Sequence, residues 1–484
     1  MTIYIVITVL FLQASIGVIL LAEKARNPVG MVHIFFFVLF VNVLHLAGLL
    51  GNNDYRYDIT YYLLTQIVLL SYLILFTLGM LWLKEMRVAP LQERIFQSTM
   101  RINNGWLIAA FSAWLIVKAY LVMRYGASAF SLFSHLQGGN AVLHFYAWWE
   151  TPVEFYARDF AVGACGVYVI KTILEKGFWR KHWVVTMAFS LFLAVYVGTH
   201  SSIVGPRRFM LLLVLLGLVT ISWRYKKSVS KFVISKWRVA LLVSIILLGA
   251  AGYYQSIRNN FLQPDIADKL LSGDLLTFAQ GVGQAMIPTS ENARVAAPAK
   301  YFREGPLSIV YEVIQKRGDG NHGTGGAITA NAFLNAIPRI IAGEAKQDIN
   351  PDNILYSQMG IVQLLNGIDP NAPDVATSLL AILIADYGLF GALFAPLILL
   401  FALTVFAALL RSRHLNNPLV TLYLFSSLLT VSGSVEGSLT IILTNFRDLL
   451  ILVIALAPFL ALKQLHPVQW MRSPLTNKRI ICKN

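Results

Sequence analysis

The amino-acid sequence predicts an all-α, polytopic membrane protein with about 11 to 12 transmembrane helices. Of its 484 residues, 57% are hydrophobic and only 13% are charged, and the mean hydropathy is +0.64. Soluble domains carry about twice that share of charged residues. The apolar runs are continuous rather than alternating, and backbone groups in hydrocarbon must be satisfied within the segment. We therefore expect helices and not barrel strands.

The apolar stretches are long enough, or nearly so, to cross a bilayer as helices. The first has no basic segment before it and no small-residue cleavage site after it, so we interpret it as a retained helix rather than a signal peptide. The predicted spans are Ile3 to Ala22, Val29 to Gly51, Tyr61 to Leu83, Trp106 to Met123, Phe155 to Leu174, Trp183 to Thr199, Phe209 to Trp223, Val239 to Tyr254, Leu389 to Leu410, Leu419 to Val435 and Phe446 to Leu462.

The net charge of +15 is explained by membrane orientation and not by nucleic-acid binding. If the N-terminus lies outside the cytoplasm, most of the 39 basic residues fall in loops on the cytoplasmic side. The acidic residues that accompany them there are only Glu23, Glu85, Glu93 and Glu175. Because cytoplasmic loops carry an excess of Lys and Arg, we expect the N-terminus outside and the C-terminus inside.

One long segment interrupts the alternation of spans and short loops. We divide the chain into N-terminal transmembrane helices (1–254), a large outward loop (255–387), C-terminal transmembrane helices (388–463) and a basic cytoplasmic tail (464–484). Amphipathic runs at Leu307 to Gln315 and Ile354 to Leu365 predict helices within the loop, and the glycine-rich stretch Gly318 to Gly326 predicts a turn. Loops of this length are usually functional.

Basic residues on the outer side need a separate explanation, because the positive-inside rule gives none. A guanidinium binds phosphate bidentately and stays charged when partly buried, so several arginines at the outer leaflet would suit a lipid diphosphate. Four abut apolar sequence, where an unpaired cation is costly: Arg207, Arg208, Arg339 and Arg447. Further candidates for glycan or phosphate contacts are Arg258, Arg303 and Arg317. Ion pairing or snorkelling to lipid headgroups is the alternative role.

Three residues are candidates for a general base. Glu436 lies near the outer end of the tenth span, Asp386 lies at the membrane edge, and His322 lies in the glycine-rich stretch. Desolvation of a carboxyl group favours such a role. The alternatives are an ion-pair partner for each carboxylate and a solvated loop residue for the histidine.

Several kinds of chemistry have no motif in this sequence. The glycine-rich stretch is not followed by Gly-Lys-Ser/Thr, and there is no zinc-ligand spacing, no Gly-x-Ser-x-Gly and no Asp-x-Asp pair for a nucleotide-sugar metal. We expect neither a cofactor nor a metal. Cys165 lies inside a span and Cys482 in the tail, so we expect no disulfide between them.

The chain resembles the oligosaccharide repeat-unit polymerases, the Wzy-type O-antigen polymerases. The similarity rests on many helices with one large outward loop, and on the elements Ile337-Pro-Arg-Ile-Ile341 with Lys346, Ser378 before Asp386-Tyr-Gly-Leu-Phe-Gly391, and Gly205-Pro-Arg-Arg208. The family's usual picture has about twelve spans with both ends cytoplasmic, from which this chain departs by one helix.

The resemblance implies a reaction at the periplasmic face of the bacterial inner membrane. A glycan on undecaprenyl diphosphate is transferred to a sugar hydroxyl of another lipid-linked repeat unit, with the diphosphate as leaving group. The cations would neutralise the diphosphate and one base would accept the proton. The implied partners are a lipid-linked donor and acceptor, membrane lipids and a chain-length regulator in the membrane, but no nucleic acid.

Three rival functions remain open at this stage. An O-antigen ligase shares the architecture and the donor. A transporter or flippase would place charged residues in mid-span, for which Lys118, Arg158 and Asp159 are the candidates. A glycosyltransferase that uses a polyprenyl monophosphate sugar would be expected to have acidic residues in the first outward loop, where Asp54 and Asp58 lie.

Overall fold

The computed structural model describes residues 2–25, 27–43, 45–46, 49, 57–85, 91–125, 147, 149–199, 206–225, 280, 306–318, 324–337, 378–410, 417–433 and 439–465. Every regular element assigned within these residues is a helix, and none of them is a strand. The all-helical prediction is therefore confirmed for the described part of the chain.

The helices follow one another along the chain with short 3-10 or π segments at some of their ends. They are α1 (Thr2–Ala22), η1 (Glu23–Ala25), α2 (Pro28–Phe37), η2 (Val38–Val43), α4 (Ile59–Glu85), α5 (Leu91–Arg101), α6 (Asn104–Tyr125), α8 (Glu150–Leu174), α9 (Phe178–Lys181), α10 (Trp183–Thr199), α11 (Pro206–Arg224), α16 (Pro306–Gly318), α17 (Ala327–Ala336), α20 (Leu379–Tyr387), η7 (Gly388–Phe390), α21 (Gly391–Leu409), α22 (Pro418–Ser432) and α23 (Leu439–Leu465).

Local sequence explains several helix starts. Asn27 and Asn417 each precede a proline, and their side chains accept a hydrogen bond from the backbone N–H of Gly30 and Leu419. Ser378 caps α20 in the same way. Asn and Ser side chains satisfy N–H groups that have no partner inside the helix, and proline suits the first helical position because it has no N–H to lose.

Every predicted span overlaps a described helix, except Val239 to Tyr254, which lies outside the described residues. The ends of Val29 to Gly51 and Leu419 to Val435 also run beyond the described residues. The last span was predicted to start at Phe446, whereas α23 begins at Leu439, so Arg447 lies within this helix and not at its outer start. Five helices in the described part of the chain are long and apolar enough to cross a membrane, and shorter apolar helices occur at α2, α10, α11 and α22. The five are Thr2–Ala25, Ile59–Lys84, Asn104–Tyr125, Leu379–Leu409 and Leu439–Pro458. These helices are compatible with a multi-pass membrane protein, while the number and sense of the spans stay predictions.

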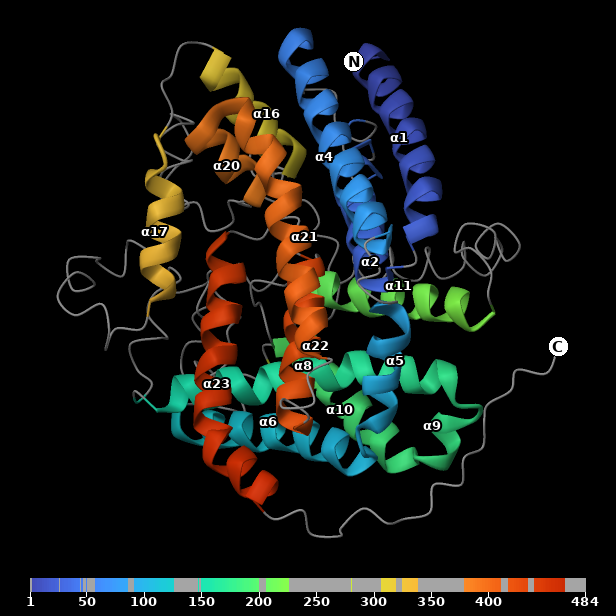
Figure 1. Ribbon diagram of the computed structural model, residues 1–484, viewed down its shortest axis with the longest axis vertical. Helices are drawn as coiled ribbons and strands as arrows, with labels where there is room; N and C mark the ends of the chain where they lie inside the picture. The colour runs from blue at the N-terminus through green and yellow to red at the C-terminus, as the bar shows by residue number, and fades with distance from the viewer. Residues whose placement is uncertain are drawn as a thin grey trace.

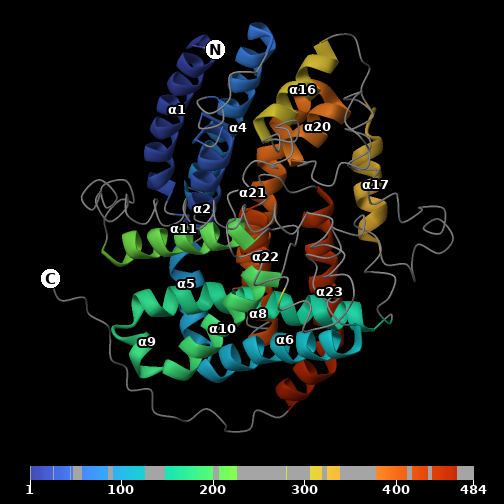
Figure 2. The same cartoon turned by 180° about the vertical axis from the view of Figure 1, so that it is seen from behind.

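The described helices run in two main directions. Figure 1 shows α1, α4, α21 and α23 along the long axis of the molecule, while α6, α8 and α11 lie across them. The view from behind shows the same arrangement (Figure 2). Four of the five candidate spans therefore share one direction, and α6 crosses it. α8 packs against α6 and is hydrogen-bonded to α23 through Tyr156, which brings three separate segments of the chain together.

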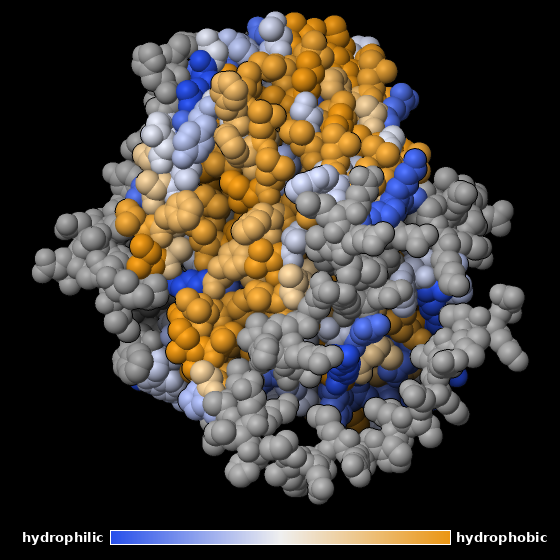
Figure 3. All heavy atoms as spheres, in the orientation of Figure 1, coloured by the Kyte–Doolittle hydropathy of each residue, from blue (hydrophilic) through white to orange (hydrophobic). Residues whose placement is uncertain are grey.

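Large apolar side chains cover much of the described surface. In Figure 3 they form a broad apolar face over the upper part of the molecule. On α1, Leu10 is 57% exposed, and on the other side of the molecule Phe390 and Phe401 are 74% and 67% exposed. Exposed apolar faces of this extent are unusual in soluble monomers and suit contact with lipid.

Part of the predicted outward loop packs among these helices. The amphipathic run Leu307 to Gln315 is helical and forms most of α16, whereas Ile354 to Leu365 lies outside the described residues. The end of the predicted loop is α20, which is buried from Leu379 to Asp386 and packs against α21. The helix is interrupted between α20 and α21 at Gly388, whose φ of 66° favours glycine. The C-terminal buried helices thus begin at Leu379, before the predicted end of the outward loop at residue 387.

Helices α8 and α22 form the closest helix contact near the charged residues. Ala157, Ala161 and Ala164 of α8 are buried, and a Cβ atom at Gly163 would collide with the backbone carbonyl of Leu422. Small residues let two helices approach until their backbones touch, as is typical of membrane helices. This contact fixes the position of α8, and with it the charged residues in its first turns.

Candidate functional site

A group of charged side chains lies where α6, α8 and α23 meet. α6 contributes Lys118, α8 contributes Glu154, Arg158 and Asp159, and α23 contributes Arg447 and Asp448; we call these six residues the charged junction. Lys118 is almost buried, with 4% of its side chain exposed, and Arg447 is the more accessible arginine, at 29%. Ionisable residues within apolar helices are costly and usually functional.

Lys118 and Glu154 form the buried ion pair of the junction. The ammonium group of Lys118 contacts the carboxylate of Glu154 across the α6–α8 interface, and it lies 6.0 Å from the ring centre of Trp114. A buried charge without a counter-ion would cost several kcal/mol, so this pair is required if either residue is to be charged.

Two Arg-Asp dipeptides supply the other charges. Arg158 donates from Nε to Oδ1 of Asp159 over 3.1 Å, and Arg447 donates from Nε to Oδ1 of Asp448 over 2.7 Å. Successive residues on a helix point about 100° apart, so adjacent side chains do not face each other as residues four apart do. Arg158 also lies over the ring of Phe155, at 4.4 Å. These pairs neutralise the arginines without the double hydrogen bond that a guanidinium makes to an ideally placed carboxylate.

Two tyrosines hold the turn of α23 that carries Arg447. The hydroxyl of Tyr156 donates to the carbonyl of Asp448 over 3.0 Å, and the hydroxyl of Tyr423 donates to the carbonyl of Asn445 over 3.2 Å. The two rings lie 6.0 Å apart. Helices α8 and α22 therefore fix the position of Arg447 through hydrogen bonds to the backbone on either side of it.

The start of α11 lies close to the ends of α10 and α22. The ring of Phe209 packs edge-on against Tyr196 of α10 at 5.3 Å, and Leu212 lies against Gly433 at the end of α22. Arg207 and Arg208 are the second and third residues of α11. Glu436 follows Gly433 by three residues but lies outside the described part of the chain. Tyr196 also interacts electrostatically with Arg158, which links this region to the charged junction.

Asp386 caps the first turn of α17. Its Oδ2 atom accepts hydrogen bonds from the backbone N–H and the hydroxyl of Thr329, over 2.7 and 2.6 Å. Its Oδ1 atom accepts from the hydroxyl of Thr324 and, over 3.3 Å, from the N–H of Ile328. The side chain is buried, with 4% exposed. A carboxylate at a helix N-terminus is stabilised by free N–H groups and by the helix dipole.

Arg317 lies beside Asp386 through the neighbouring carbonyl. Its Nη2 atom donates to the carbonyl of Ala385 over 2.7 Å, and the N–H of Thr324 donates to the same carbonyl over 3.2 Å. The structure therefore joins two of the residues predicted from the sequence, although they are 69 positions apart, at the end of α20.

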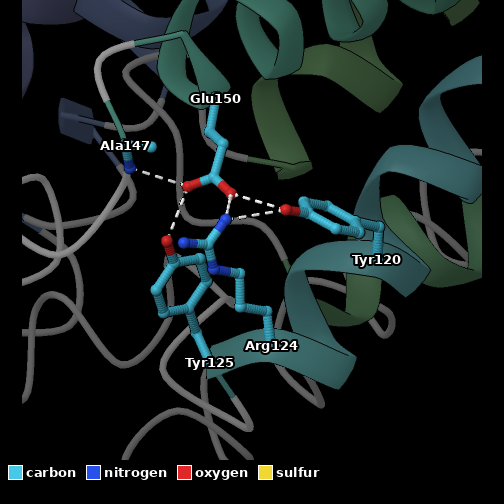
Figure 4. A network of polar contacts seen from close by, with 5 residues as sticks. All are labelled: Tyr120, Arg124, Tyr125, Ala147 and Glu150. Carbon is cyan, nitrogen blue, oxygen red and sulfur yellow. Dashed lines mark hydrogen bonds and ion pairs between the residues drawn. The ribbon is translucent and has the colours of Figure 1, made fainter.

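A separate network surrounds Glu150 at the start of α8 (Figure 4). Its carboxylate, 1% exposed, accepts from the hydroxyls of Tyr120 and Tyr125 over 2.9 and 2.6 Å. It also accepts from Arg124 over 2.6 Å and from the backbone N–H of Ala147 over 2.7 Å. These contacts tie the end of α6 to the start of α8 and hold both helices beside the junction.

The predicted site residues fall into four groups. Arg447 is part of the charged junction, and Arg317 and Asp386 meet at the end of α20. For Arg207 and Arg208 the structure describes the backbone at the start of α11. The others lie outside the described residues and stay predictions: Arg258, Arg303, Arg339, His322 and Glu436.

Sequence reasoning overlooked Tyr156, Tyr423, Glu154 and Asp448. The repeated Arg-Asp dipeptide in two apolar helices was a usable signal for Asp448, whereas nothing in the sequence distinguishes the two tyrosines from other aromatic residues. Within the residues that the structure describes, no three His, Cys, Asp or Glu side chains are grouped in a way that would hold a metal ion. No protein-family model, curated protein or solved structure matches the chain.

Proposed function

We propose that this protein is a membrane glycosyltransferase that polymerises undecaprenyl-diphosphate-linked oligosaccharide repeat units at the periplasmic face of the inner membrane. In this reaction the bond between the sugar anomeric carbon and the diphosphate oxygen breaks. A new glycosidic bond forms to a hydroxyl group of the acceptor, a base takes the hydroxyl proton, and undecaprenyl diphosphate leaves. The energy is contained in the donor, so the reaction needs no nucleotide.

The observation that carries the proposal is the position of Arg447. It was singled out from the sequence as an outward cation beside the bilayer, and it lies part-exposed in a charged group between apolar helices. Its turn is held by Tyr156 and Tyr423. A fixed arginine stabilises negative charge that develops on a leaving group better than a mobile one, because it needs no reorganisation during the reaction.

The charges of the junction itself balance, since three cations face three carboxylates. A diphosphate needs an excess of positive charge. We assign that excess to Arg207 and Arg208, at the start of α11, and to Arg339. The N-terminal end of α11 adds the favourable end of a helix dipole for an anion. Arg258, Arg303 and Arg317 remain candidates for further contacts with glycan or phosphate.

The test is to delete the gene and to analyse surface polysaccharide on a gel. We expect the mutant to keep the band of lipid A core with a single repeat unit and to lose the ladder of longer chains. Loss of the single-repeat band together with the ladder would instead indicate a ligase or a transporter. An unchanged ladder would refute the polymerase proposal.

Complementation with Arg447→Ala and Arg339→Ala should fail to restore the ladder, with normal amounts of protein in the membrane. Arg180→Ala is the matched control, because Arg180 is an exposed arginine that stacks on Trp179 at 4.7 Å and has no assigned part in the reaction. A normal ladder with both test variants would remove these arginines from the diphosphate site.

Transport is the second candidate, and two observations favour it. Lys118, Arg158 and Asp159 all belong to the charged junction, and α20 and α21 are separated by a break at Gly388. Charged residues and interrupted helices are typical of secondary transporters. A mutant without transport should accumulate lipid-linked single repeat units on the cytoplasmic leaflet of the inner membrane and export none. A reagent that labels the lipid-linked unit from the periplasmic side should therefore label it in a polymerase mutant but not in a transport mutant.

A further inference from the structure

The contacts of Asp386 are those of a positioning residue. A general base must present a free lone pair to the proton that it removes. Both carboxylate oxygens of Asp386 instead accept two hydrogen bonds each, from Thr324, Ile328 and Thr329, and the side chain is buried. For Asp386 to reach a sugar hydroxyl, the first turn of α17 would have to separate from it.

The same contacts fix one end of the predicted glycine-rich turn between α16 and α17, of which residues 319–323 lie outside the described part of the chain. Thr324 closes this turn, and it is held twice, through its hydroxyl to Asp386 and through its N–H to the carbonyl of Ala385. Gly325 and Gly326 follow with φ angles of 59° and 92°, which let the chain enter α17 at the point where Asp386 caps it.

The other end of the turn is fixed as well. Gly318 ends α16, and it packs so closely on the ring of Tyr61 from α4 that a Cβ atom would collide with it. Arg317, one residue earlier, donates to the carbonyl of Ala385. The end at Gly318 is thus tied to α4 and, through Arg317, to the end of α20, and the end at Thr324 is also tied to the end of α20.

We propose that Asp386 is a positioning residue that holds Thr324 and the first turn of α17 against the end of α20, and is not the base of the reaction. We call Arg317, Thr324, Thr329 and Asp386 the α20 clamp. This inference rests on the proposed function for the reaction that it serves, but the clamp itself is testable without it. It leaves His322 and Glu436, which both lie outside the described residues, as the bases to be tested.

The first experiment measures the clamp directly. Asn321→Cys is introduced into the full-length protein with Cys482→Ser, while the natural Cys165 stays because it is buried. Membrane-impermeant maleimide is then added to the protein in phosphatidylethanolamine–phosphatidylglycerol vesicles. Removing two hydrogen bonds with Asp386→Asn, or with Thr324→Val and Thr329→Val together, should raise the labelling rate about tenfold. Thr324→Ser keeps the hydroxyl and should label as the unmodified protein does. Unchanged labelling in the first two variants would overturn the clamp.

The second experiment measures polymerisation with repeat-unit lipid extracted from the deletion strain. Asp386→Asn and the double threonine variant should each lower kcat, and the triple variant should lose less than the product of the two separate effects, because both changes act on the contacts between Asp386 and the threonine hydroxyls. In these variants kcat/KM should still fall as the pH is lowered, because the base that must be deprotonated is another residue. If Asp386 is the base, Asp386→Asn removes this fall at low pH while the threonine variant stays active, and that result would refute the positioning role.

The two experiments also separate failure of the inference from failure of the proposed function. Absence of polymerisation by the unmodified protein would count against the function alone, because labelling would still report on the clamp. Each variant is first compared with the unmodified protein by thermal unfolding in detergent, and Thr324→Ser supplies the folded control.

Discussion

Lys118 of α6 and Glu154 of α8 show how an apolar helix can carry a charge when a neighbouring helix supplies the opposite charge. Lys118 is 4% exposed and Glu154 is 14% exposed, so neither group is well hydrated and each depends on the other. Removal of one partner leaves an uncompensated charge in surroundings of low dielectric constant, whereas removal of both leaves an apolar contact of similar volume. Each charged residue therefore needs the other for stability, but the fold does not need the pair itself.

Lys118→Met should lower the free energy of unfolding by about 3 kcal/mol, because Glu154 loses its counter-ion. The double variant Lys118→Met with Glu154→Leu should recover most of that loss. Thermal unfolding of the purified protein in detergent measures both. Equal destabilisation by the single and double variants would show that the two side chains do not form a pair.

Helices α8 and α22 show how a close backbone contact places charged residues. Gly163 touches the backbone of Leu422, and two turns earlier Tyr156 reaches across to α23. A wider spacing between α8 and α22 would move Tyr156 and Arg158 away from the turn that carries Arg447. The geometry of the junction thus depends on a residue that has no charge.

Gly163→Ala should destabilise the protein by about 2 kcal/mol or more, since a methyl group must push two helix backbones apart. Gly17→Ala is the matched control, because Gly17 lies within α1 and a Cβ atom there meets nothing. That change should be neutral or slightly stabilising, as alanine has the higher helix propensity. Melting temperatures of the two variants in detergent compare them, and similar values would contradict the contact.

The exposed apolar surface of the described helices and the charge distribution of the sequence point to the same environment. The helices of the described part present large apolar side chains outward, as on α1 and α21, and the basic residues gather in alternate loops of the sequence. Lipid would cover the exposed apolar side chains, and the basic loops would lie on the cytoplasmic side of the membrane, as the positive-inside rule predicts.

The predicted orientation is tested with fusions to reporters of known location. A fluorescent protein attached at the C-terminus should fluoresce, because it stays in the cytoplasm, and alkaline phosphatase inserted near Lys300 should be active, because residues 255–387 are predicted to lie outside. Reciprocal results would mean that the chain has the opposite orientation, and the proposed site would then lie on the cytoplasmic side.

Apolar composition and run length were sufficient to locate the long apolar helices, but not α5, α17 or α20. α10 has the predicted bounds Trp183 to Thr199, and α6 extends the predicted span by two residues at each end. Lipid-facing helices can be recognised in this way because hydrocarbon requires an apolar, internally hydrogen-bonded segment wherever the chain crosses it. The sequence also singled out Arg447, since a cation beside apolar residues is costly enough to be noticeable.

Only the tertiary structure decided which of these residues meet. The sequence left Asp386 as either a base or an ion-pair partner, whereas in the structure it caps α17. Arg158 was one of three mid-span charges, and only the structure places its helix α8 against α23. Contacts between Arg317 and Ala385, or between Tyr156 and Asp448, join positions far apart in the chain. Such pairings depend on how helices pack, which is determined by the shapes of all their side chains together, whereas the formation of each helix depends mainly on its own sequence.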